Sequence, residues 1–199
     1  MKRRGLLILA VLVLLLVVLG GSCVSTYNSL VTLDQAVEGQ WAQVENAYQR
    51  RADLIPNVVE VVKGAAAHER ETLEAVTQAR AQVGSISIGD AARDPAALKR
   101  FQAAQDQLGS ALSRLIAVSE AYPQLRANEN FLALQSQLEG TENRITVERQ
   151  RFNEAAREFN VKRDTFPTVV FAGFFGERFK SKAYFSASVG AEQAPQVKF

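Results

Sequence analysis

The sequence predicts an all-α protein, an elongated antiparallel bundle of about four long helices behind an N-terminal transmembrane or signal segment. After residue 24, Ala, Gln, Glu, Arg and Leu dominate the chain. Apolar residues there recur at spacings of three and four, as on one face of a helix, and alternating strand patterns are scarce. We therefore divide the chain into a basic region with an anchor segment (residues 1–24), a helical bundle (residues 25–165) and a C-terminal tail (residues 166–199).

The N-terminal segment has the length and composition of a membrane segment. Leu6–Leu19 is an unbroken run of fourteen apolar residues, and no charge occurs between Gly5 and Val24. A bilayer span needs about 20 residues, whereas the apolar core of a signal peptide has about 7–15. A helix that packs one face on the core of a soluble protein carries polar residues on its other face, and this segment has no polar face.

The charges around this segment predict its orientation. Lys2, Arg3 and Arg4 precede it, and no Lys or Arg follows before Arg50. Because basic residues stay on the cytoplasmic side, the N-terminus is expected in the cytoplasm before any cleavage, and the bundle on the extracytoplasmic side.

Cys23 offers a second kind of anchor. The run Leu19-Gly20-Gly21-Ser22-Cys23 resembles a bacterial lipoprotein processing site, although Gly20 stands where Leu is usual. Three interpretations stay open: a lipid attached to Cys23, an uncleaved single-pass signal anchor, and a chance cysteine near the membrane.

The second half of the body carries two regular heptad patterns. One begins at Asp94-Pro95, a favourable N-cap followed by a proline at the first helical position; its apolar members are Phe101, Leu108, Leu115 and Tyr122. The other can be capped by Asn128 or Asn130 and must end at Phe166-Pro167; its members are Phe131, Leu138, Ile145, Phe152 and Phe159. A helix over residues 130–163 would be about 50 Å long, so it needs long partners.

The first half supplies such partners. One apolar run contains Val37, Trp41, Val44 and Tyr48, and a second contains Val59, Val62, Ala66, Leu73, Val76 and Val83. Pro56 lies between them and predicts a kink or a short break, because proline lacks the backbone N–H. Residues 84–90 predict a loop that ends this part.

The tail is aromatic and rich in glycine. Phe166, Phe171, Phe174 and Phe175 make it too apolar for a free linker. It is expected to pack back on the bundle; the alternative is a contact with the membrane surface, aided by the basic residues Arg178, Lys180 and Lys182. Residues 190–199 are expected to be mobile or extended.

Composition and motifs favour a non-enzymatic protein without a cofactor or metal. The chain has 23 basic and 21 acidic residues, and without the three opening bases the body has 20 and 21, which argues against nucleic-acid binding. Cys23 and His68 are the only Cys and His, too few for a zinc site. His68-Glu69 begins a metalloprotease-like motif that lacks the second His, because Thr72 stands in its place.

One polar cluster is a candidate partner-binding site. Arg50, Arg51, Asp53 and Asn57 surround Pro56. Their side chains could supply hydrogen bonds to carbonyls freed by the proline, or they could form a docking surface.

The same stretch closely resembles the LemA family. The similarity lies in Arg50–Asn57, Val58-Val59-Glu60 and Lys63-Gly64, with Tyr27–Val31 and Trp41 before them, His68-Glu69 after them, and Phe159-Asn160, Phe166-Pro167, Ala172-Gly173, Phe175-Gly176, Ala194-Pro195 and Phe199 in the tail. The resemblance covers about residues 27–199. It implies a long-helix antiparallel bundle on a membrane anchor, and it implies no catalytic residue and no cofactor.

Together these observations predict a membrane-tethered, non-catalytic binding or scaffold protein of the bacterial cell envelope. Its expected partners are membrane lipid, through the N-terminal segment, and an envelope or membrane protein. One alternative is an accessory factor of an envelope protease, or a hydrolase with unrecognised chemistry. Another is a homo-oligomeric coiled coil formed through the seam from Phe131 to Phe159.

Overall fold

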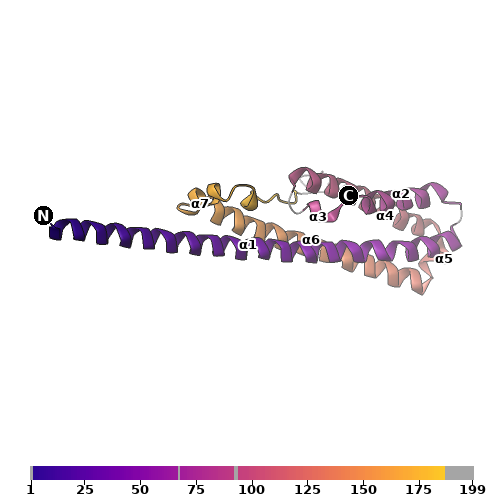
Figure 1. The fold of residues 1–199 in the computed structure, drawn as a ribbon. Coiled ribbons are helices and arrows are strands. Elements are labelled where there is room, and N and C mark those ends of the chain that lie inside the picture. Colours follow the sequence, from indigo (N-terminus) through magenta and orange to yellow (C-terminus); the bar gives the residue numbers. More distant parts are fainter. Residues whose placement is uncertain (1, 67, 92–93, 187–199) are drawn as a thin grey trace, which may run out of the picture. The chain divides into compact units, whose positions relative to one another are not determined.

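The computed structural model describes residues 2–66, 68–91 and 94–186, and this part of the chain is all-α, as predicted (Figure 1). Four helices have 15 residues or more; they are α1 (Lys2–Ala65), α2 (Arg70–Gly84), α4 (Pro95–Ala121) and α6 (Glu129–Asp164). Shorter elements join or follow them: α3 (Ile88–Ala91), α5 (Pro123–Arg126), α7 (Thr168–Phe174) and the 3₁₀ helix η1 (Gly176–Phe179). The expectation for residues 190–199 lies outside the described residues.

The chain forms two compact units. Among the described residues, unit 1 consists of residues 2–39 and 154–181, and unit 2 of residues 40–66, 68–91, 94–153 and 182–186.

In unit 1, helix α1 changes character along its length. The large apolar side chains described between Leu6 and Leu19 are 51–71% exposed. This part of α1 is long and apolar enough to cross a membrane. Further along, Leu30 and Val37 are buried, as expected for a helix with one apolar stripe.

The tail packs back in unit 1, as predicted, but through fewer aromatic residues than expected. Phe179 is fully buried and lies against Phe159 of α6, with ring centroids 6.4 Å apart. Arg163 of α6 donates a hydrogen bond to the Phe179 carbonyl at 2.6 Å. Phe166 and Phe174, however, are 79% and 84% exposed.

In unit 2, an aromatic cluster joins four parts of the chain. Trp41 of α1 contacts Phe101 of α4, Phe152 of α6 and Phe185, with ring centroids 5.9, 5.3 and 5.9 Å away. Such offset and edge-to-face pairs add stabilisation beyond the area they bury. Phe185 therefore packs the segment after η1 onto the helices of this unit.

The predicted helix ends in unit 2 are mostly confirmed. Asp94 caps α4 by accepting a hydrogen bond from the Ala96 N–H at 2.9 Å, with Pro95 as the first helical residue. Asn128 caps α6 by accepting from the Phe131 N–H at 3.1 Å. Residues 84–90 are not a simple loop, because α3 begins at Ile88.

Pro56 does not break its helix, contrary to one of the two expectations. It lies inside α1, and the interruption comes instead between Ala65 and Arg70, within the second apolar run. Because Pro56 has no N–H, the carbonyl of Ala52 loses its intrahelical donor. Arg80 of α2 replaces it, with its Nε donating to that carbonyl at 3.2 Å.

This replacement can be tested by a double-mutant cycle. Because Pro56 is exposed, Pro56→Ala should raise the free energy of unfolding by about 1–3 kcal/mol. Arg80→Ala should lower it by about 0.5–1 kcal/mol in the wild type and by less in the Pro56→Ala background, where Ala52 regains its backbone donor. Thermal unfolding of the full chain in detergent, followed by circular dichroism, measures the cycle.

Arg100→Ala, at an exposed arginine of α4, serves as the control for loss of a basic side chain. Equal losses from Arg80→Ala in both backgrounds would contradict the explanation.

Candidate partner-binding groove

Unit 2 contains an open groove of about 850 Å³ between α1, α4 and α6. Helix α1 contributes Tyr48 and Arg51, and α6 contributes Leu138, Glu139, Glu142 and Arg149. The α4 side is lined by Ala103, Gln105, Asp106, Gln107, Gly109, Ser110, Leu112, Ser113, Arg114 and Ile116. The groove thus combines apolar side chains with charges of both signs.

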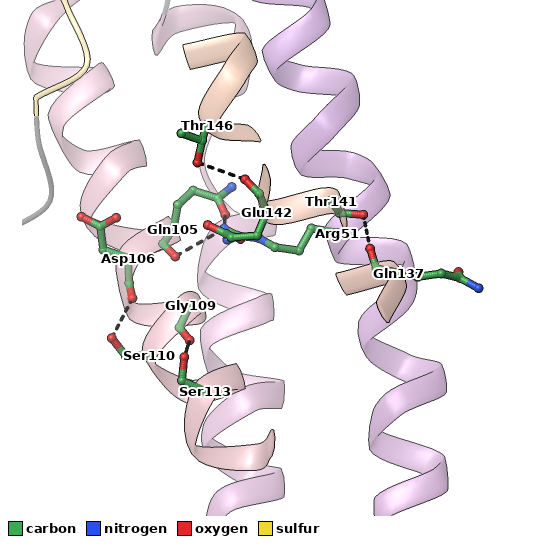
Figure 2. A network of polar contacts seen from close by, with 10 residues as sticks. All are labelled: Arg51, Gln105, Asp106, Gly109, Ser110, Ser113, Gln137, Thr141, Glu142 and Thr146. Atoms are coloured by element: carbon green, nitrogen blue, oxygen red, sulfur yellow. Dashed lines mark hydrogen bonds and ion pairs between the residues drawn. The ribbon is translucent and has the colours of Figure 1, made fainter. Parts of the chain in front are cut away.

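Arg51 joins the three helices at this groove. Its side chain is only 3% exposed, and its Nη1 forms an ion pair with Glu142 of α6 at 2.7 Å. Its Nη2 donates to both the side-chain and the main-chain oxygen of Gln105 on α4. Figure 2 shows the guanidinium between these two partners. A planar guanidinium suits this role because its donors point in fixed, diverging directions.

Tyr48 completes the surroundings of Arg51. The guanidinium carbon of Arg51 lies 5.2 Å from the centre of the Tyr48 ring, in the range of a cation–π contact. Burial raises the pKa of the Tyr48 phenol, and the charges of Arg149 and Arg51 oppose this rise only in part. The phenol is therefore neutral at physiological pH.

A second buried charge lies on α6. Glu148 is fully buried, and its Oε1 accepts from Arg144 at 2.7 Å and from Arg151 at 3.1 Å. Its Oε2 has no hydrogen-bond partner among the described residues. Thr141, one heptad earlier, is also buried and donates to the Gln137 carbonyl at 2.7 Å. Thr141 and Glu148 each lie three residues after an apolar member of the heptad pattern of α6, Leu138 or Ile145, and both face the interior.

The structure separates the four residues predicted for partner contact. Arg51 points inward and lines the groove, whereas Arg50, Asp53 and Asn57 are exposed. Asp53 accepts a hydrogen bond from Gln49 at 2.8 Å, one helical turn away. None of the four side chains donates to the Ala52 carbonyl that Pro56 leaves without its helical donor. Arg80 of α2 forms this hydrogen bond instead, so the interpretation of the cluster as a local support for the proline is wrong.

The remaining candidates lie outside the groove. Cys23 is half-buried within α1, and His68 is exposed in the connection between α1 and α2. Among the described residues, no group of three or more His, Cys, Asp or Glu side chains could hold a metal ion.

Sequence reasoning missed most of the groove. The charged residues of α4 and α6 follow the pattern of a solvent-exposed helix face. This pattern gave no reason to single out Gln105, Glu142 or Arg149. The one available signal was Gln105, because it directly follows the apolar position Ala104 and precedes Leu108 by three residues. Its partner on another helix could not be read from the spacing.

Comparison with known proteins places the groove inside a recognised family region. The model of the LemA family matches residues 40–199, a range that includes every residue lining the groove. No residue of the exposed apolar segment falls within that match.

Named relatives are found at low identity. Magnetosome protein MamQ of Magnetospirillum gryphiswaldense is 29% identical over 196 residues, covering 90% of this chain and 71% of that protein. Magnetosome protein MamQ 2 of Paramagnetospirillum magneticum is 27% identical over 176 residues, with 80% and 64% covered. Protein LemA of Metamycoplasma hominis is 26% identical over 141 residues, with 71% and 61% covered. The chain thus spans about two thirds of the length of these relatives.

Adjacent arginines provide a matched test of Arg51. Arg51→Ala should lower the free energy of unfolding by about 2 kcal/mol, because it removes hydrogen bonds to two helices and leaves Gln105 without its donor. Arg50→Ala, at an exposed position of the same helix, should change it by no more than about 0.5 kcal/mol. Thermal unfolding of the full chain in detergent measures both, and equal effects would rule out the bridging role of Arg51.

The raised pKa of Tyr48 predicts a loss of stability at high pH. Below pH 10, the ordinary pKa of a tyrosine phenol, Tyr48 is neutral in the folded and the unfolded state, and its full contribution to stability is present. As the pH rises through the higher pKa of the folded state, the unfolded chain loses its proton first and that contribution disappears. Tyr48→Phe should therefore flatten the fall in melting temperature above pH 10. An unchanged fall would show that Tyr48 is not its source.

Proposed function

Because the chain belongs to the LemA family, we propose that it is a membrane-tethered, non-catalytic binding or scaffold protein of the bacterial cell envelope. The groove around Arg51 is its proposed binding surface, and a segment of an envelope or membrane protein is the proposed occupant. The observation that carries this proposal is an open groove with a buried arginine at its floor and charged side chains along it.

The anchor supports the membrane part of the proposal. Helix α1 begins with an exposed apolar segment and continues without a loop into the residues buried in unit 1. The basic residues before that segment favour a cytoplasmic N-terminus and a body on the other side. An uncleaved span and a lipid on Cys23 would both tether the body to that side of the membrane.

The chemistry of the groove supports a protein partner. Ala103 and Ile116 offer accessible apolar contact area, while Arg114, Glu142 and Arg149 offer accessible charges of both signs. Arginine is enriched among the residues that contribute most to protein interfaces. A phosphate backbone would instead require an excess of basic side chains, which this groove lacks.

The same chemistry supports a non-catalytic role. The charges of Arg51 and Glu142 are used in pairing with each other at 2.7 Å. The pKa of Tyr48 is raised above that of an ordinary phenol, further from physiological pH, so this phenol is poorly suited to proton transfer there. The names of the relatives state a location or a family and no reaction.

Gly109 allows the groove to be blocked without disturbing the core. It lines the groove, and a Cβ atom built there meets nothing within 4 Å. Gly109→Ala should leave partner binding intact and raise the free energy of unfolding by about 0.5–1 kcal/mol, because alanine favours a helix interior. Gly109→Trp should fill the groove and remove binding while the helix content stays unchanged.

Binding is measured by photo-cross-linking in intact cells. A photoreactive residue placed at Ser113, on the groove side of α4, should capture a defined envelope or membrane protein. Lys99, also exposed on α4 but outside the groove, is the matched control position. Capture that is equal at both positions, or that survives Gly109→Trp, would contradict the proposal.

The exposed face of Arg50, Asp53 and Asn57 forms a separate arm of the same experiment. Combined alanine substitutions there should weaken capture if this face widens the binding surface, without the loss of stability expected for Arg51→Ala. Capture unaffected by these changes would confine the binding surface to the groove.

A further inference from the structure

We propose that α7 is a membrane-interface element whose exposed apolar side chains enter the headgroup region of the bilayer crossed by α1. The proposal rests on the membrane span proposed for residues 5–24. It adds a second contact with the lipid, on the side of the membrane where the body lies.

The position of α7 within unit 1 is the first argument. Tyr27 follows Val24, the last residue of the proposed span, by three residues, which is about 4.5 Å along a helix. Its ring contacts Phe175, directly after α7, and Phe179, with centroids 5.0 and 5.6 Å apart. These contacts hold the end of α7 at the level where the span leaves the hydrocarbon.

The second argument is the distribution of apolar side chains on α7. A helix that only covers a core buries its large apolar residues, whereas α7 buries small residues and exposes large ones. Its buried positions, Thr168 and Ala172, are small. Three of its four large apolar side chains point outward: Val169 is 44%, Val170 51% and Phe174 84% exposed, whereas Phe171 is half-buried. Phe166, just before the helix, is 79% exposed. Large apolar residues on the outer face are typical of a helix that lies in a lipid interface.

The polar surroundings of α7 fit an interface with charged headgroups. The guanidinium carbon of Arg178 lies 5.3 Å from the Tyr27 ring centre and 5.7 Å from that of Phe179. Tyrosine rings are enriched where membrane proteins meet the headgroups, and basic side chains beside a helix that lies in the interface favour anionic lipid. Lys180 follows in the same unit and is exposed. These features favour lipid over a protein as the occupant of this face.

Fluorescence quenching by brominated lipid tests the depth of α7. The full chain is reconstituted into vesicles of phosphatidylcholine and phosphatidylglycerol whose acyl chains carry bromine. Trp41, the single native tryptophan, is buried in unit 2 and supplies the background signal. Phe174→Trp reports on α7, Val13→Trp on the proposed span, and Leu132→Trp on an exposed apolar position near the start of α6.

Quenching of the Phe174→Trp variant should exceed that of Leu132→Trp by at least about twofold. It should be greater with phosphatidylglycerol than with phosphatidylcholine alone. Circular dichroism of each variant checks that the helices are retained.

The outcomes separate this inference from the anchor itself. Strong quenching of Val13→Trp with none of Phe174→Trp would overturn the role of α7 and leave the span intact. Absence of quenching in both would remove the span and, with it, the inference. A blue-shifted but unquenched Phe174→Trp signal would show that protein covers this face, which also overturns the inference. Equal quenching in the two lipid compositions would overturn the part assigned to the basic residues.

Discussion

The buried guanidinium of Arg51 imposes the most demanding constraint on unit 2. A charge removed from water must be matched by acceptors, and the structure supplies them from two other helices, Gln105 on α4 and Glu142 on α6. Because each acceptor is held by its own helix, the requirement fixes the register of α1 against both. The Glu142 side chain is 57% exposed, so water screens the ion pair between Arg51 and Glu142. This ion pair therefore contributes more to the alignment of α1 and α6 than to the free energy of unfolding.

The groove follows from the same constraint. Small or polar side chains along α4, among them Ala103, Gly109 and Ser113, leave space beside the arginine that larger residues would have filled. Further along α1, Pro56 leaves the Ala52 carbonyl without its helical donor. Arg80 of α2 donates the missing hydrogen bond. In both places a local demand on α1 is met by a side chain from another helix, which ties the helices of unit 2 together beyond their apolar contacts.

Unit 1 differs from unit 2 because much of its apolar surface is exposed. Its part of α1 is apolar on all sides at first, and only from Thr26 onward does it carry buried residues. The tail then meets α1 at Tyr27, close to this change, and leaves Phe166 and Phe174 uncovered. The helices of unit 1 cover Phe179, whereas Phe166 and Phe174 face another environment, which we propose to be lipid.

The sequence by itself determined the helices, most of their ends and the apolar anchor, because spacing, capping and proline act over a few residues. Asp94, Asn128 and the seven-residue step from Phe131 to Phe159 could therefore be interpreted without a structure. Only the tertiary structure decided that Pro56 stays inside its helix, that Arg51 turns inward while Arg50 stays exposed, and that Gln105 and Glu142 receive it. Each of these depends on a partner more than 20 residues away in the chain, and a pattern within one helix carries no information about which face of another helix it will meet.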